Sequence, residues 1–376
     1  MKIHIKNGRL IDPKNGIDAQ RDIYIAAGKI VAVGGAPANF GANRTIDAGG
    51  HVVCPGLVDM LRRRAKALSR ARLYPIGALT VKLKGEALTE MGQLTDAGCV
   101  AFSQANTPLA DTQVLWHALQ YAATFGYAVW LRAEDTWLAR DGVAHDGEVA
   151  TRLGLPGIPS FAETIALGTL LELVRATGAQ VHVCRLSTAG AVELMRRARQ
   201  DKLPVTCDAA IHHIHLSEMD LGYFDSHCRL EPPLRSQRDR DALARAVAEG
   251  VVDCIVSDHT PVDEDGKHLP FAEAEAGATG LELLLPLTLK WGSAQKLSLA
   301  ATLARITSQP AAILGVASGR IALGANADLA IFAPEEPLRV VPEALKSQGK
   351  NTPFVGYELA GRVRYTLVAG NLVYEA

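Results

Sequence analysis

The stretch CVAFSQANTPLADTQVLWHALQYAATFGYAVWLRAE, residues 99–134, decides the fold class of this chain. A short apolar run stands at each of its ends, and a longer stretch between them carries its apolar residues at helical spacing. Gly126 follows the helical stretch and can serve as its C-cap. The order strand, helix, strand predicts a βαβ unit of a parallel sheet.

Working outward, the same alternation continues through most of the chain. Further helices are expected at 160–178 and 239–250, each ending near a glycine. This repetition favours a TIM-like (β/α) barrel over an open sheet, and no G-x-G-x-x-G fingerprint indicates dinucleotide binding. The seven expected strands lie in 52–60, 72–80, 99–105, 127–134, 180–187, 204–210 and 253–260, so an eight-stranded barrel is one β-α unit short.

Both ends of the chain have a different character. Short strand-like runs separated by Gly, Asn and Asp turns fill residues 3–53, and similar runs return in 320–376. We therefore expect the two ends to pack into one small β-sandwich. The predicted domains are a sandwich of 1–53 with 318–376 and a barrel of 54–317.

Composition excludes several classes of protein. Hydrophobic residues make up 48% and charged residues 21% of the 376 residues, as in ordinary globular proteins. The net charge of -1 provides no field for binding nucleic acid or an anionic membrane. No secretory signal or membrane span is recognised, so a cytoplasmic location is expected, with the six scattered cysteines as buried thiols.

Several phrases, in order along the chain, resemble the dihydroorotases of the amidohydrolase superfamily. The likeness extends over residues 1–376. The phrases are VVCPGLVDM (52–60), RLYPIGALT (72–80), EVATRLGLPGIPS (148–160), VHVCRLSTAG (181–190), LEPPLRS (230–236), VSDHTP (256–261), GATGLELLLPL (277–287) and KNTPF (350–354). The resemblance implies a (β/α) barrel whose active site lies at the C-terminal ends of the strands.

The resemblance also implies a metal centre that this sequence does not preserve. Active members hold one or two zinc ions with an H-x-H motif, an acidic or carboxylated lysine ligand, two further histidines and an aspartate. Of these, Asp258 remains, beside His259. The former metal-ligand positions are occupied here by Leu61, Arg63, Gln104, Arg132, Arg185 and Asp258.

A protonated guanidinium offers no lone pair to a cation, so Arg132 and Arg185 should repel zinc. No metal or other cofactor is therefore expected. Because an unpaired buried charge is costly, we expect both arginines to pair with Asp258 in place of the metal. The same two arginines are also candidates for binding a small anion.

Other polar clusters leave alternatives open. His212, His213 and His215 could form a relocated metal site, but histidines hydrogen-bonded at a strand end are the favoured interpretation. Asp258 and His259 could act as an acid–base pair, although no nucleophile or metal accompanies them. Ser187 and Thr188 are expected to cap the helix that follows them.

The stretch LRRRAKALSRAR (61–72) is strongly basic, and a solvated helix face is favoured there over a docking edge for an acidic partner. This helix alone bridges Asp59 to the YPIGA strand. The family carries there a further β-α unit of roughly thirty residues or more.

The resemblance is closest to the non-catalytic dihydroorotase homologues that assemble with aspartate carbamoyltransferase. The leading expectation is therefore a pseudoenzyme, not an enzyme, that supports the transferase catalytic chain in a hetero-oligomer of pyrimidine synthesis. One alternative is an active dihydroorotase or related cyclic-amide hydrolase with an atypical site around His213, His215 and Asp258. The other is a small-anion sensor that uses Arg132 and Arg185.

Overall fold

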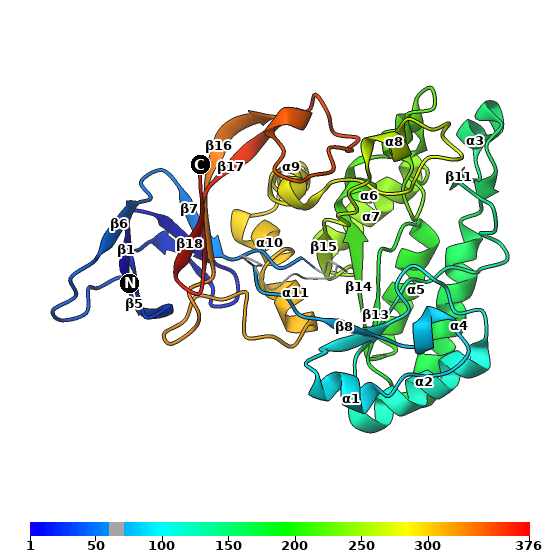
Figure 1. Ribbon diagram of the computed structural model, residues 1–376, viewed down its shortest axis with the longest axis horizontal. Helices are drawn as coiled ribbons and strands as arrows, with labels where there is room; N and C mark the ends of the chain where they lie inside the picture. The colour runs from blue at the N-terminus through cyan, green and yellow to red at the C-terminus, as the bar shows by residue number, and fades with distance from the viewer. Residues whose placement is uncertain (60–70) are drawn as a thin grey trace.

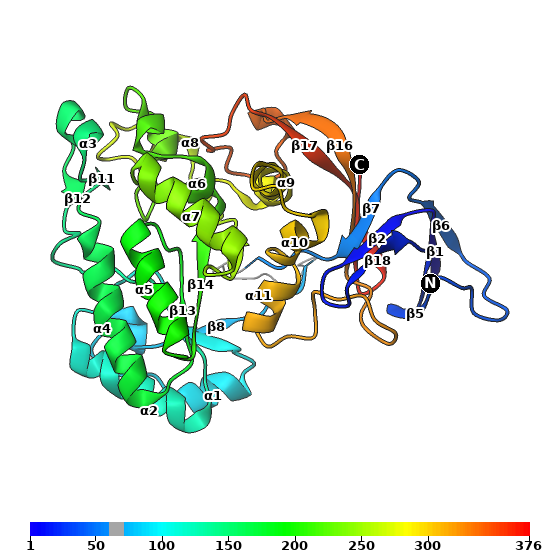
Figure 2. The ribbon, with the colours of Figure 1, turned by 180° about the vertical axis from the view of Figure 1, so that it is seen from behind.

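A computed structural model describes residues 1–59 and 71–376. Figures 1 and 2 show an α/β part on one side and, on the other, a β-rich part in which the two ends of the chain lie together. These parts correspond to the expected barrel and sandwich, and the barrel-type α/β fold is confirmed.

The α/β part is organised around a parallel sheet of six strands in the order β15-β14-β13-β10-β9-β8. Consecutive strands in the sequence are neighbours in the sheet, as expected for successive βαβ units. The strands are β8 (Ile76–Ala78), β9 (Ala101–Ser103), β10 (Val129–Leu131), β13 (Val181–Val183), β14 (Val205–Ala210) and β15 (Cys254–Val256).

The connecting helices cover the outside of this sheet (Figure 2). The predicted glycine caps are confirmed, since Gly126, Gly178 and Gly250 each end a helix in the left-handed conformation. The helices are α1 (Met91–Asp96), α2 (Thr112–Phe125), α3 (Glu148–Leu153), α4 (Phe161–Thr177), α5 (Ala189–Gln200), α6 (Ile211–His215), α7 (Gln237–Glu249), α8 (Glu264–Lys267), α9 (Leu284–Ala294), α10 (Leu299–Ala304) and α11 (Ser308–Ile313). A two-stranded pair, β11 (Ala144–His145) and β12 (Gly157–Ile158), lies before α4.

One predicted barrel strand belongs to the other part of the molecule. Residues 52–60 were expected to form the first barrel strand, but β7 (Val52–Pro55) pairs with strands from both ends of the chain. All four of its residues are buried, so the sequence could not tell a barrel strand from a strand between two packed layers. Among the described residues, the parallel sheet therefore has six of the seven expected strands.

The β-rich part consists of two sheets. One has the order β5-β4-β1-β6 and the other the order β18-β17-β16-β7-β2-β3, so N-terminal and C-terminal strands share the second sheet. The strands are β1 (Lys2–Lys6), β2 (Arg9–Asp12), β3 (Ile17–Gln20), β4 (Ile23–Ala26), β5 (Lys29–Val33), β6 (Arg44–Asp47), β16 (Leu329–Arg339), β17 (Glu358–Val368) and β18 (Asn371–Glu375).

Strands β7 and β16 join the two parts by burying both of their faces. Val53 and Ile331 belong to the core between the two sheets, whereas Cys54 and Phe332 belong to the core of the α/β part. Successive side chains of a strand point to opposite faces, so these strands contribute to both cores. The division at residues 53/54 and 317/318 stays a prediction.

No helix among the described residues is long and apolar enough to cross a membrane. Five of the six cysteines are buried, and Cys99 is half-buried.

Candidate functional site

Four of the predicted site residues stand where strands of the parallel sheet end. Gln104 directly follows β9 and Arg132 directly follows β10, while Arg185 and Asp258 come two residues after β13 and β15. Because parallel strands end at one edge, these side chains are brought to the same end of the sheet. The other two positions, Leu61 and Arg63, lie outside the described residues, as does the basic stretch up to Arg70.

Arg185 is held by a dense set of contacts. Its Nη1 donates to Asp258 Oδ1 at 3.0 Å and to the carbonyl of Glu231 at 3.1 Å, and its Nη2 donates to Asn106 Oδ1 at 2.6 Å. Its backbone N–H donates to Asp208 at 2.7 Å, which fixes the residue at a φ of 57°. The guanidinium and Asp258 thus form a mostly buried ion pair at the strand ends.

Arg132 pairs with a different carboxylate from the one expected. Its Nη2 lies 2.6 Å from Glu134 Oε1, and Asp258 is already engaged by Arg185. The expected pairing of both arginines with Asp258 is therefore wrong for Arg132. Glu134 lies two residues beyond Arg132, on the same side of the extended chain, and that spacing was the sequence signal that we overlooked.

Gln104 takes part in a neutral contact. Its Oε1 accepts a hydrogen bond from Thr80 at 2.9 Å, and its buried Nε2 has no hydrogen-bond partner among the residues described. Thr80 lies just beyond β8, so this contact ties the ends of two neighbouring strands together.

Burial raises the pKa of two carboxyl groups here. For Asp258, burial is the main cause, and the charge of Arg185 opposes it. For Asp59, burial raises the pKa to about 6, although the carboxylate accepts hydrogen bonds from the backbone N–H and the hydroxyl of Ser257. The low-dielectric surroundings favour the neutral acid in both cases.

The described strand ends do not fit the zinc centre that the family resemblance implies. A zinc site needs three or four ligand atoms with free lone pairs. Asp258 offers a carboxylate, but it is paired with Arg185, and Arg132 and Gln104 stand at two other positions where the resemblance implies ligands. A cation would face two guanidinium groups at this place.

The three neighbouring histidines do not converge on a metal position. They lie in the short helix α6, where the Nε2 atoms of His213 and His215 lie 3.0 and 2.9 Å from the carbonyls of Pro232 and Leu287. His212 is stacked on Phe354. Burial lowers their pKa values, to about 3 for His212 and about 4 for His213 and His215, so all three are neutral near pH 7.

Other predicted residues have structural contacts. Thr188 caps α5 by accepting a hydrogen bond from the N–H of Ala191, as expected, while Ser187 accepts one from Arg235. His259 Nδ1 accepts from the N–H of Gly280 at 3.3 Å, so the neighbour of Asp258 is used in a loop contact.

The sequence analysis missed one cluster of potential metal ligands. His182, Cys184 and Asp208 are buried with their ligand atoms within 4.8 Å of one another. Both ring nitrogens of His182 are already engaged, with Thr206 at 2.8 Å and Asp208 at 2.9 Å. This arrangement connects β13 to β14, and the spacing of His182 in β13 and Cys184 just after it was the available signal.

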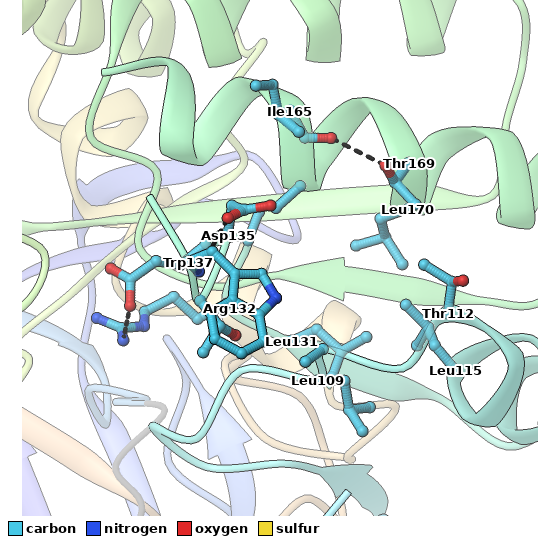
Figure 3. A pocket seen from close by; sticks show the side chains of 15 residues that line it. Leu109, Thr112, Leu115, Leu131, Arg132, Asp135, Trp137, Ile165, Thr169 and Leu170 are labelled. Carbon is cyan, nitrogen blue, oxygen red and sulfur yellow. Dashed lines mark hydrogen bonds and ion pairs between the residues drawn. The ribbon is translucent and has the colours of Figure 1, made fainter. Parts of the chain in front are cut away.

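A small pocket of about 100 Å³ adjoins Arg132 between α2 and α4 (Figure 3). Aliphatic side chains from both helices, including Leu115 and Leu170, line one part of it, and the segment Leu131–Trp137 lines another. The exposed indole of Trp137 lies at its edge, and the Arg132–Glu134 ion pair lies on one side of it (Figure 3).

Comparison with known proteins gives matches over the whole chain. Residues 17–191 match the dihydro-orotase-like family and residues 135–374 match the amidohydrolase family. The chain is 41% identical to a dihydroorotase-like protein of Pseudomonas aeruginosa, with all of both chains covered. It is 34% identical, again over all of both chains, to a dihydroorotase of Geobacter sp. strain M21.

The alignment with the Pseudomonas protein has 423 positions against 376 residues here, which leaves at least 47 positions without a counterpart in this chain. The comparison does not place these positions along the chain, so the absence of a β-α unit between Asp59 and the YPIGA strand stays a prediction.

Solved structures show the same fold. An L-hydantoinase (dihydropyrimidinase) of Arthrobacter aurescens superposes with a TM-score of 0.85 at 23% identity, covering 99% of this chain and 96% of that one. The hydantoinases and the relatives named dihydroorotase are hydrolytic enzymes. The expectation that this chain is not an enzyme is therefore wrong, because it conflicts with the enzymatic nature of the family.

Proposed function

The chain belongs to the amidohydrolase family as a dihydroorotase-like member, and from this premise we propose that it assembles with the catalytic chain of aspartate carbamoyltransferase. In this hetero-oligomer the barrel would support the transferase in pyrimidine synthesis. The observation that supports the proposal is the contrast between a family fold kept along the whole chain and strand ends rebuilt from ion pairs. Selection for an interaction surface would keep the fold independently of the metal ligands.

We further propose that the strand ends work without zinc. Arg185 supplies the positive charge that would otherwise come from the ion. Asp258, the one remaining ligand carboxylate, neutralises this charge. This arrangement keeps the strand ends together without an uncompensated buried charge.

Co-expression with the transferase chain tests the assembly. We expect one species on size exclusion that contains both chains in fixed proportion, and a transferase that loses activity when the barrel chain is left out. Two separate species, together with a transferase that is fully active alone, would refute the proposal. Hydrolysis is a separate property and is measured in its own assay.

Cyclic-amide hydrolysis is the second candidate, because relatives aligned over the full chain are named dihydroorotase. The acidic group available at the strand ends is Asp258, whose neighbours include His213 and Arg185. Purified protein is assayed for opening of the dihydroorotate ring, with and without added zinc. Turnover that disappears in an Asp258→Asn variant shown by circular dichroism to be folded would support this activity, whereas turnover unchanged in that variant would place the chemistry elsewhere.

A further inference from the structure

Arg229 is a buried arginine that has no ion pair among the described residues. It is 9% exposed, and its one hydrogen bond through the guanidinium runs from Nη1 to the carbonyl of Leu230 at 3.4 Å. Its Nε is buried and has no hydrogen-bond partner in residues 1–59 or 71–376. A guanidinium in such surroundings normally binds a carboxylate or phosphate, so Arg229 has unused capacity for an anion.

Arg132 has unused donors as well. Glu134 and the carbonyl of Asn106 contact only its Nη2, while its buried Nε and Nη1 have no hydrogen-bond partner in the part of the chain that the structure describes. The side chain is 6% exposed, so little water reaches these groups. Arg185 differs, because both of its Nη atoms are engaged by Asp258, Glu231 and Asn106.

Glu231 lies near Arg132 and two residues after Arg229, and its charge acts on both guanidinium groups. Its Oε2 lies 3.9 Å from Arg132 Nη1, much farther than the 2.6 Å and 3.0 Å of the Glu134–Arg132 and Asp258–Arg185 pairs. The negative charges of Glu231 and Glu134 act on Arg229 and Arg132 alike. The Glu231 side chain is 39% exposed, so it can turn toward solvent without breaking a close contact.

Lys267 adds a further positive charge beside this group. Its Nζ donates to the carbonyl of Arg229 at 3.2 Å and to two other carbonyls, and no carboxylate lies within ion-pair distance among the described residues. Burial and the charge of Arg229 lower its pKa to about 8. A negative group bound close to Arg229 would therefore be attracted by two cations, the Arg229 guanidinium and the Lys267 ammonium group.

We propose that Arg132 and Arg229 form a binding site for a small oxyanion, a carboxylate or phosphate group, and that Glu231 occupies this site as an internal competitor. The ligand displaces the Glu231 side chain into solvent and takes up the free N–H groups of the two arginines. This site is independent of assembly with a transferase and of hydrolysis. The sequence led us to expect an anion at Arg132 and Arg185. We now place it at Arg132 and Arg229, because both Nη atoms of Arg185 already have partners.

If Glu231 competes with the ligand, removal of its charge should strengthen the binding of the oxyanion. Titration calorimetry of the full chain with inorganic phosphate and with succinate distinguishes the two kinds of oxyanion. Glu231→Gln removes the competing charge and should tighten the binding of at least one probe by about tenfold or more. Arg229→Gln and Arg132→Gln should each weaken that binding by a similar factor, and both effects should shrink at high salt.

A matched control is Glu336→Gln, which removes a carboxylate that pairs with Arg362 and Arg364 in the β-rich part. It should leave the affinity unchanged. Because Arg132→Gln leaves Glu134 without its partner, circular dichroism of each variant verifies folding, and Arg229→Gln, which breaks no ion pair, remains the decisive loss. Binding that is equal or weaker in Glu231→Gln, or unchanged in Arg229→Gln, or absent from every variant for both probes, would overturn the proposal.

Discussion

At the scale of single residues, the strand ends are governed by how guanidinium charges are compensated. Arg185 has a partner for each Nη, Arg132 has a partner for one, and Arg229 has no carboxylate at ion-pair distance among the described residues. A buried guanidinium N–H without a partner costs free energy, because water cannot replace the missing partner. The same N–H group is available to a ligand. The chemistry of this end of the barrel therefore depends on which arginine is left incompletely paired.

Replacement of Asp258 tests the Arg185 pair. Asp258→Asn leaves the Arg185 guanidinium mostly buried without a carboxylate and should lower the free energy of unfolding by about 3–5 kcal/mol. Urea denaturation at pH 7 measures this change. The control Asp18→Asn breaks an exposed pair with Arg9 and should cost about 0–1 kcal/mol. An unchanged stability in Asp258→Asn would contradict a structural role for the pair.

At the scale of elements, the helices that follow the strands of the parallel sheet position several of the side chains at the strand ends. Helix α5 begins at Ala189, behind its N-cap Thr188 in the loop that follows β13, and α6 begins directly where β14 ends. These starts place caps and histidines next to the charged residues. The stability of such segments can be tested one element at a time.

The Thr188 cap should stabilise α5. Thr188→Ala removes the acceptor for the N–H of Ala191 and should cost about 1 kcal/mol, whereas Thr188→Ser keeps the hydroxyl and should restore most of the loss. Thermal and urea unfolding report both values. Equal losses in the two variants would show that the methyl group matters and the cap does not.

Helix α6 should make the protein sensitive to acid. Its three histidines have pKa values of about 3 to 4 in the fold against 6.5 in the unfolded chain, so the unfolded state binds more protons below pH 6.5. Stability should therefore fall as the pH drops from about 6.5 toward 4, by about 1.4 kcal/mol per pH unit for each histidine. Asp59, with a raised pKa of about 6, acts in the opposite direction between about pH 6 and 4.

His212→Phe tests this dependence. The ring nitrogens of His212 are buried without hydrogen-bond partners and the ring is stacked on Phe354, so phenylalanine should be tolerated at pH 7. Unfolding measured from pH 7 to 4.5 should show a shallower loss of stability than in the parent chain. The exposed His268, replaced by Gln, is the control and should leave the slope unchanged. A slope unchanged in His212→Phe would contradict the assignment.

At the scale of the whole molecule, β7 and β16 make the two parts depend on each other. Each strand buries one face in the sandwich core and the other in the core of the α/β part. The strand ends on the far side of that core are held by ion pairs. We therefore propose that this end of the α/β part keeps its structure without a metal ion.

Removal of metal tests that conclusion on the intact chain. Dialysis against a chelator should leave the melting temperature unchanged, and added zinc should not raise it, because a ligand stabilises only the state that binds it. Elemental analysis of the purified protein accompanies the melting curves. A melting temperature that falls on chelation, with about one zinc ion per chain before it, would refute zinc-independent strand ends.

The sequence by itself determined the alternation of strands and helices, the glycine caps and the β-rich character of both ends. These follow from local periodicity and from backbone preferences that act within a few residues. It also determined which residue types replace the ligands at Gln104, Arg132 and Arg185, because a guanidinium cannot coordinate a cation in any fold.

Only the tertiary structure decided that β7 lies in the sandwich sheet, that Arg132 pairs with Glu134, and that Arg229 is left without a carboxylate. A strand buried on both faces has the same apolar sequence pattern in a barrel and between two packed layers. The ion-pair partner of a charged side chain is determined by distances between segments that can be far apart in the sequence. Burial and pairing are properties of the packed molecule, and the local pattern of residues does not contain them.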